Sequence, residues 1–185
     1  MKRITTSGFS LAEMLVTVAI LGIIAKVVIP LLSSNDPQKL AVAAEETANT
    51  LRFALSEARR TGGYVLVDGL STAGQLTLYY SDANANVPPT AGTSAISDPL
   101  TKRAARLNVA GSPFSQGVSL TPQFWAGGFI RAQLLIGPGL TQFQGSDGNI
   151  STQGPLQANS GVLLSYGAQS VTVSINQITG LVTLP

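Results

Sequence analysis

A lone carboxylate, Glu13, stands at the head of the most apolar stretch of this 185-residue chain. Behind it, twelve of the nineteen residues at 14–32 are Leu, Ile or Val, and Lys26 is the single charge. A carboxylate at the head of a membrane helix is costly unless something pairs with it, so Glu13 is a candidate functional residue. The alternative is an interfacial carboxylate that the dipole of the helix favours modestly.

The sequence lacks two residue types on which many catalytic and metal sites depend. The sequence has no Cys and no His, which excludes disulfides, thiolate zinc sites, Cys nucleophiles and His-based triads. The remaining polar residues form no recognisable catalytic motif, so we expect no enzyme, no cofactor and no metal. The triplet Asp147-Gly148-Asn149 is compatible with a calcium loop, but a single such triplet favours a turn.

The apolar run predicts a membrane-spanning helix. Its Leu, Ile and Val residues favour insertion by roughly 4 to 7 kcal/mol, against at most about 3 kcal/mol for Lys26. A helix over residues 9–32 is about 36 Å long, enough to cross a hydrocarbon core of about 30 Å. Lys2 and Arg3 precede the run, so we expect a cytoplasmic N-terminus and an exported remainder.

An ordinary secretory signal peptide is the alternative for this stretch. Ala41-Val42-Ala43 has the small-x-small form that a signal peptidase accepts. The apolar run is longer than the usual 7 to 15 or so residues of such a peptide, and polar or mixed residues separate it from that site. The pattern therefore favours a retained helix.

The order of residues at this end resembles the class III signal of type IV prepilins and type II secretion pseudopilins. The matching features are Lys-Arg, Gly8 directly before Phe9, Glu13 four residues after Phe9, and an apolar helix. The resemblance implies cleavage between Gly8 and Phe9 by a prepilin peptidase and N-methylation of Phe9. It also implies assembly into a filament, in which Glu13 meets the Phe9 amine of a neighbouring subunit. Lys26 departs from the family pattern.

Residues 33–37 predict a loosening or break of the helix, followed by a second helix over residues 37–61. Asp36 is the expected N-cap, Pro37 the first helical residue and Gly62-Gly63 the C-cap. Apolar positions recur at steps of three or four and form one face. That face consists of Leu40, Ala44, Thr47, Leu51, Leu55 and Ala58.

After Gly63 the apolar pattern changes toward a period of two, which predicts short antiparallel strands. The expected strands are residues 64–67, 75–80, 106–110, 118–122, 129–136, 161–166, 170–175 and 181–184. In residues 170–175 we expect Val171, Val173 and Ile175 to point inward. The last two strands should form a hairpin. Residues 81–102 and 137–159 are expected to be long loops.

Further matching segments are residues 51–62, with Ala58-Arg59 near the end of the helix, and residues 161–164, 171–175 and 179–182 of the tail. Together they resemble pseudopilin H and the FimT-type minor pilins. The fold class implied is α+β and pilin-like: a long N-terminal helix, half membrane and half amphipathic, packed on a C-terminal antiparallel β-sheet head. The expected segments are a leader at 1–8, a polymerisation helix at 9–32, its amphipathic continuation at 33–62 and a periplasmic head at 63–185.

The resemblance implies a structural subunit of a type II secretion pseudopilus or type IV pilus, located in the bacterial inner membrane with a periplasmic head. The expected partners are other pilin or pseudopilin subunits, the prepilin peptidase, the inner membrane and the secretion or pilus assembly platform. The alternatives are a DNA-binding minor pilin for DNA uptake and a membrane-anchored periplasmic domain that never polymerises.

Nucleic acid is not favoured as a partner. The net charge is +2, and it falls to about zero without Lys2 and Arg3. The FimT-like proteins that bind DNA carry a basic Gly-Arg-x-Arg-type tail, whereas the corresponding tail, residues 180–183, has no Arg. Two further groups have ordinary explanations: a solvated face for Lys102, Arg103 and Arg106, and sheet or core packing for the aromatic residues at 124–129.

Overall fold

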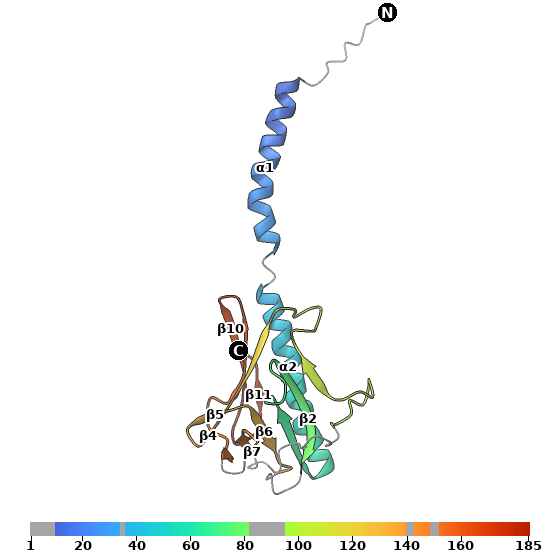
Figure 1. The fold of residues 1–185 in the computed structure, drawn as a ribbon, viewed down its shortest axis with the longest axis vertical. Coiled ribbons are helices and arrows are strands. Elements are labelled where there is room, and N and C mark those ends of the chain that lie inside the picture. Colours follow the sequence, from blue (N-terminus) through green and yellow to red (C-terminus); the bar gives the residue numbers. More distant parts are fainter. Residues whose placement is uncertain (1–9, 34–35, 82–94, 140–142, 149–151) are drawn as a thin grey trace, which may run out of the picture. The chain divides into compact units, whose positions relative to one another are not determined.

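The protein is described by a computed structural model that covers residues 10–33, 36–81, 95–139, 143–148 and 152–185. The chain divides into two compact units, Met1–Asn35 and Asp36–Pro185. In the first unit, the described residues form one helix, α1 (Leu11–Ser33). In the second, they form helix α2 (Asp36–Thr61) and two β-sheets (Figure 1).

Helix α1 ends at Ser33 and α2 begins at Asp36, so the described residues form two helices rather than one. Pro37 explains this break. A proline has no backbone N–H, and its ring clashes with the carbonyl of the residue four positions earlier. For Pro37 that residue is Ser33, the last residue of α1.

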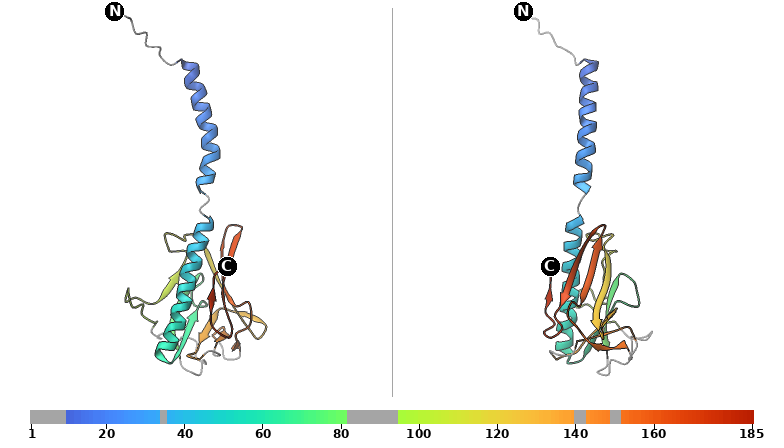
Figure 2. Two further views of the ribbon diagram at one scale, coloured as in Figure 1. Left: turned by 180° about the vertical axis from the view of Figure 1, so that it is seen from behind. Right: turned by 90° about the vertical axis from the view of Figure 1, so that its left-hand side faces the viewer.

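Helix α2 buries the face that the sequence predicts. All six of its predicted inward residues are at most 8% exposed. Within the second unit, α2 packs on strands of both sheets (Figure 2). It ends at Thr61, and Gly62 follows with a φ of +66°. This left-handed conformation is the one that glycine adopts at a helix C-terminus without steric cost, so the predicted C-cap is confirmed.

The described strands form two sheets with antiparallel pairings. The first sheet has the order β3-β2-β1-β6-β7-β8, and the second has the order β11-β10-β9-β4-β5. The strands of the first sheet are β1 (Tyr64–Asp68), β2 (Gln75–Ser81), β3 (Arg106–Asn108), β6 (Gln133–Ile136), β7 (Phe143–Ser146) and β8 (Gly154–Pro155). Those of the second are β4 (Ser119–Ala126), β5 (Phe129–Arg131), β9 (Gly161–Tyr166), β10 (Gln169–Ile175) and β11 (Val182–Thr183).

The predicted strands are largely confirmed. The hairpin at the end of the chain pairs Ile175 with Val182, and Val173 and Ile175 are buried while Val171 is half-buried. The predicted strand at 129–136 is two strands, β5 and β6, which lie in different sheets. Strand β4 continues to Ala126, beyond its predicted end.

The prediction of a loop over 137–159 is wrong in part, because β7 and β8 lie inside it. Strand β7 has the sequence Phe-Gln-Gly-Ser, with one large apolar residue. Its Gly145 has no room for a side chain, since a Cβ there would lie 2.9 Å from Ala126 Cβ. The close packing of the neighbouring strand therefore requires glycine at this position. An alternating pattern that predicts a strand would have an apolar side chain here. In the other predicted loop, residues 82–94 lie outside the described residues.

The predicted pilin-like fold is wrong. A long N-terminal helix with a membrane half and an amphipathic half was expected, and the described residues form two short helices of 23 and 26 residues instead. Most of the regular secondary structure of the second unit consists of the two antiparallel sheets. The physical reasons are the break before Pro37 and the additional strand pairs in residues 143–155.

The predicted location is also corrected. Among the described residues, no helix combines the length and the apolar character that crossing a membrane requires. The expected single-pass anchor in the inner membrane is therefore wrong. Both Glu13 and Lys26 lie within α1, and ionised side chains inside a hydrocarbon core are costly.

Candidate functional site

The N-terminus of α1 contains Glu13, the predicted assembly residue. The backbone N–H of Ser10 donates to Glu13 Oε2 at 3.0 Å, and the backbone N–H of Glu13 donates to Ser10 Oγ at 3.2 Å. This reciprocal pair is a capping box, which satisfies two otherwise unpaired N–H groups at the start of a helix. The Ser-x-x-Glu spacing before an apolar run was a readable signal that the sequence analysis did not use.

The capping box gives Glu13 a partner within its own helix. The hydrogen bonds of the box are solvent-exposed, so exchanging one of them for another donor costs little. The predicted cleavage residues, Gly8 and Phe9, lie outside the described residues. The expected pairing of Glu13 with a Phe9 amine therefore stays a prediction.

The side chains of α1 form an exposed apolar surface. Nine large apolar residues of this helix are at least 50% exposed: Leu11, Met14, Leu15, Val16, Val18, Ile20, Leu21, Ile23 and Ile24. Several are sequence neighbours, and neighbouring helical residues point about 100° apart. The apolar surface therefore surrounds the helix. Exposed apolar surface of this extent marks a site of interaction.

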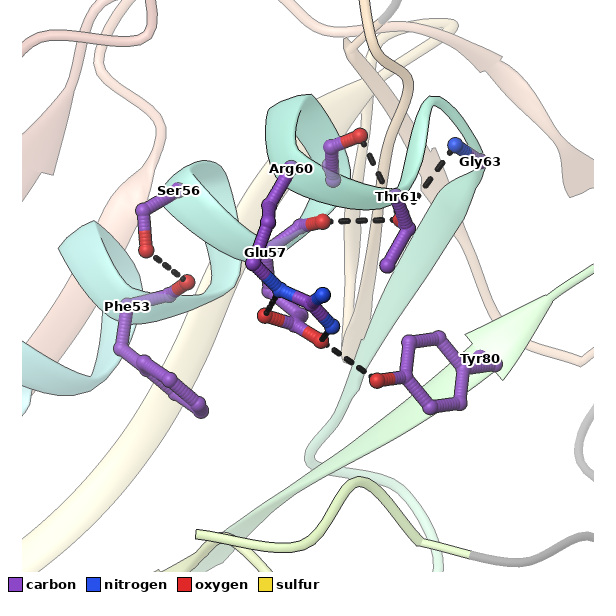
Figure 3. Close-up of polar contacts among 8 residues, drawn as sticks. Phe53, Ser56, Glu57, Arg60, Thr61, Gly63 and Tyr80 are labelled. Atoms are coloured by element: carbon purple, nitrogen blue, oxygen red, sulfur yellow. Dashed lines mark hydrogen bonds and ion pairs between the residues drawn. The ribbon is translucent and has the colours of Figure 1, made fainter. Parts of the chain in front are cut away.

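A second cluster, absent from the sequence analysis, lies at the C-terminal end of α2 (Figure 3). Glu57 is 6% exposed. Arg60 donates to both of its carboxylate oxygens, from Nε at 2.8 Å and from Nη2 at 2.5 Å. The hydroxyl of Tyr80, on β2, donates to Glu57 Oε1. The Glu57–Arg60–Tyr80 cluster thus joins α2 to the first sheet across 23 positions of sequence.

The electrostatics of this cluster favour the ionised carboxylate. The hydrogen bonds from Arg60 lower the pKa of Glu57 to about 2, with a smaller contribution from Tyr80, while burial acts in the opposite direction. The same contacts raise the pKa values of Tyr80 and Arg60. A general base works best with a pKa near the working pH and a free oxygen. Glu57 has neither property near pH 7, so we assign the cluster a structural role.

We expect the free energy of unfolding to fall as the pH drops from about 4.5 toward 2. Glu57 has a lower pKa in the folded protein than when unfolded, so its contribution is complete above about pH 4.5 and is lost below it. The full shift corresponds to about 3 kcal/mol. Because Arg60 is 66% exposed, solvent screening reduces this to about 1–2 kcal/mol. Urea unfolding at a series of pH values measures it.

The matched variants for this prediction are Glu57→Gln and Glu45→Gln. The parent's free energy of unfolding should fall between pH 5 and pH 2.5, and Glu57→Gln should remove most of this fall. Glu45 lies on the same helix, but its ion pair with Arg52 is long, at 3.7 Å, and exposed. Glu45→Gln should leave the pH dependence nearly unchanged. Equal effects of the two substitutions would contradict the prediction.

Asp147, which the sequence analysis considered as part of a calcium loop, contacts neighbouring residues of the protein. Asp147 accepts a hydrogen bond from the backbone N–H of Ala132 at 2.8 Å. It also forms an ion pair with Arg131, at 2.9 Å. Within the described ranges, no three Asp or Glu residues are grouped as metal ligands would be. Asp147 therefore stabilises the junction between β5 and β6 in this structure.

The aromatic residues at 124–129 divide between core and surface. Phe124 is fully buried, which confirms the core packing expected of it, and Trp125 is half-buried. Phe129 is 65% exposed, and the guanidinium carbon of Arg131 lies 5.2 Å from its ring centroid. The basic residues at 102, 103 and 106 are exposed, as predicted for a solvated face.

The chain matches no protein-family model, no curated protein and no solved structure. The resemblance to prepilins and minor pilins therefore depends on the sequence motifs at the N-terminus, in the second helix and in the tail.

Proposed function

We propose that this protein is a minor pilin or pseudopilin, a structural subunit of a pilus-like filament. Contacts between the α1 helices of neighbouring subunits hold this filament together. The observation that supports this is the apolar surface that surrounds α1, formed by nine side chains that are at least half exposed. Helices of neighbouring subunits that cover this surface stabilise the filament by on the order of 10 kcal/mol per subunit. This figure assumes about 2 kcal/mol for each fully buried side chain. No cofactor or catalytic group is required for this role.

In this proposal the chain is a precursor that a prepilin peptidase cleaves between Gly8 and Phe9. Cleavage frees the α-amine of Phe9, which is then N-methylated. Within the filament, that positively charged amine pairs with Glu13 of a neighbouring subunit. A full positive charge on the amine attracts the Glu13 carboxylate more strongly than the uncharged, exposed N–H of Ser10 does. The partners are other pilin or pseudopilin subunits, the prepilin peptidase and an assembly platform.

The test is to express the full chain with and without a prepilin peptidase, then determine its N-terminus by intact mass and its assembly by sedimentation. We expect a mature chain beginning at N-methylated Phe9, and sedimenting filaments, only when the peptidase is present. A chain that begins at Met1 or after Ala43 would overturn the proposal.

A matched pair of variants tests whether α1 is the contact. Leu21 is 63% exposed on α1 and Leu100 is 91% exposed in the second unit. Leu21→Lys should reduce the sedimenting fraction at least about tenfold, because a buried ammonium between apolar helices is costly. Leu100→Lys should assemble as the parent does. Normal assembly of Leu21→Lys would exclude α1 as the polymerisation element.

A further inference from the structure

Helix α2 carries an exposed line of residues opposite its buried face. These residues recur at steps of three and four, so they lie on one side of the helix. They are Val42, Glu45, Asn49, Arg52, Ser56 and Arg59. The line is acidic toward its N-terminal end, at Glu45, and basic toward its C-terminal end, at Arg52 and Arg59. The exposed line therefore carries negative charge at one end and positive charge at the other.

Two grooves accompany this line. The first has a volume of about 560 Å³ and is lined by Glu45 together with Leu40, Ala41, Ala44 and Leu184, among others. The second has a volume of about 530 Å³ and is lined by residues that include Arg52, Arg59, Gly180 and Leu181. We call this surface, the exposed line of α2 with residues 180–184, the α2–β11 face. Strand β11 is the edge strand of its sheet.

Apolar side chains on the α2–β11 face are exposed. Leu181, beside the basic end, is 63% exposed, and Leu184, in the first groove, is 39% exposed. The first groove contains the small residues Ala41 and Ala44, which leave room for a side chain from outside. The face therefore offers a projecting leucine at its basic end and an apolar hollow at its acidic end.

The charges on this face are available to a partner. The ion pair between Glu45 and Arg52 is 3.7 Å long, and the two side chains are 54% and 45% exposed, respectively. Such a pair contributes about 0–1 kcal/mol, so a partner can replace it at little cost. Arg59 is exposed, and within the part of the chain that the structure describes it has neither an ion pair nor a side-chain hydrogen bond.

We propose that the α2–β11 face is a head-to-tail contact between copies of this chain. The basic end of one copy, with Arg59 and Leu181, docks on the acidic end of the next, with Glu45 and the first groove. A second copy is the occupant that fits, because it presents both the complementary charge and the complementary shape. Glu45 and Arg59 are fourteen residues apart, so parallel copies are offset by about 21 Å along α2.

This inference rests on the proposed filament, because a head-to-tail contact that does not close generates a filament. Charge reversal in the full chain tests it. Glu45→Lys and Arg59→Glu should each reduce the sedimenting fraction about tenfold, and the double variant should regain most of the assembly of the parent. Lys102→Glu, a change at an exposed residue that lines neither groove, should assemble normally. Failure of the double variant to recover would overturn the pairing.

Crosslinking tests the arrangement directly, because the chain contains no Cys. Filaments mixed from Glu45→Cys copies and Arg59→Cys copies should form dimers with a bismaleimide, whereas filaments of either variant alone should not. A double-cysteine variant should give a ladder of oligomers. Closed dimers instead of a ladder would overturn the head-to-tail arrangement. Filaments without crosslinks would overturn this contact alone, whereas failure of the parent chain to form filaments would overturn the proposed function.

Discussion

Replacing Gly161 with alanine should lower the free energy of unfolding by about 3 kcal/mol or more. A Cβ at this position would lie 2.2 Å from the carbonyl oxygen of Val173 and 3.0 Å from Ser174 Cα. Both atoms belong to the backbone of β10, and Gly161 pairs with Ser174 in the ladder between β9 and β10. Relief of the overlap requires the strands to separate. Urea unfolding followed by the fluorescence of Trp125, the single tryptophan, measures the loss.

Gly154→Ala is the matched control for this prediction. Gly154 also lies in a strand, but a Cβ there would have its nearest neighbour, Gly127 N, at 3.5 Å. This is an ordinary contact distance, so the control should change the unfolding free energy by less than about 1 kcal/mol. If the two alanine variants have the same stability, the close approach of β9 and β10 is not what requires glycine at position 161.

Leu51→Ala should have a comparable effect, a loss of about 3–5 kcal/mol. Leu51 lies in the middle of α2 and is fully buried in the core that this helix shares with both sheets. Truncation removes apolar contacts and leaves a cavity, because the surrounding strands are held in register by their hydrogen bonds. The loss of stability should appear in urea unfolding monitored by circular dichroism.

Leu100→Ala is the control for the core substitution. It makes the same chemical change at a side chain that is 91% exposed. A surface change of this kind alters stability by about 0.5 kcal/mol or less. A large loss for Leu100→Ala, or a small one for Leu51→Ala, would contradict the position of α2 at the centre of the core.

The sequence predicted elements whose signals are local. The buried face of α2 could be read from apolar residues at steps of three and four, and all six of its residues are buried. The closing hairpin could be read from alternation in residues 170–175 and from the turn that follows. Ser10 and Glu13, three positions apart, form a capping box, and this signal was also present in the sequence. In each case the interacting residues are neighbours along the chain, so their spacing carries the information.

The tertiary structure decided the features that depend on distant residues. Strands β7 and β8 lack an apolar pattern and exist because the neighbouring strands pair with them. Glu57 meets Tyr80 across 23 positions, and Gly161 meets the backbone of β10. Sequence periodicity determines which side of an element is apolar, whereas the partner of that side is determined by packing between segments far apart in the chain.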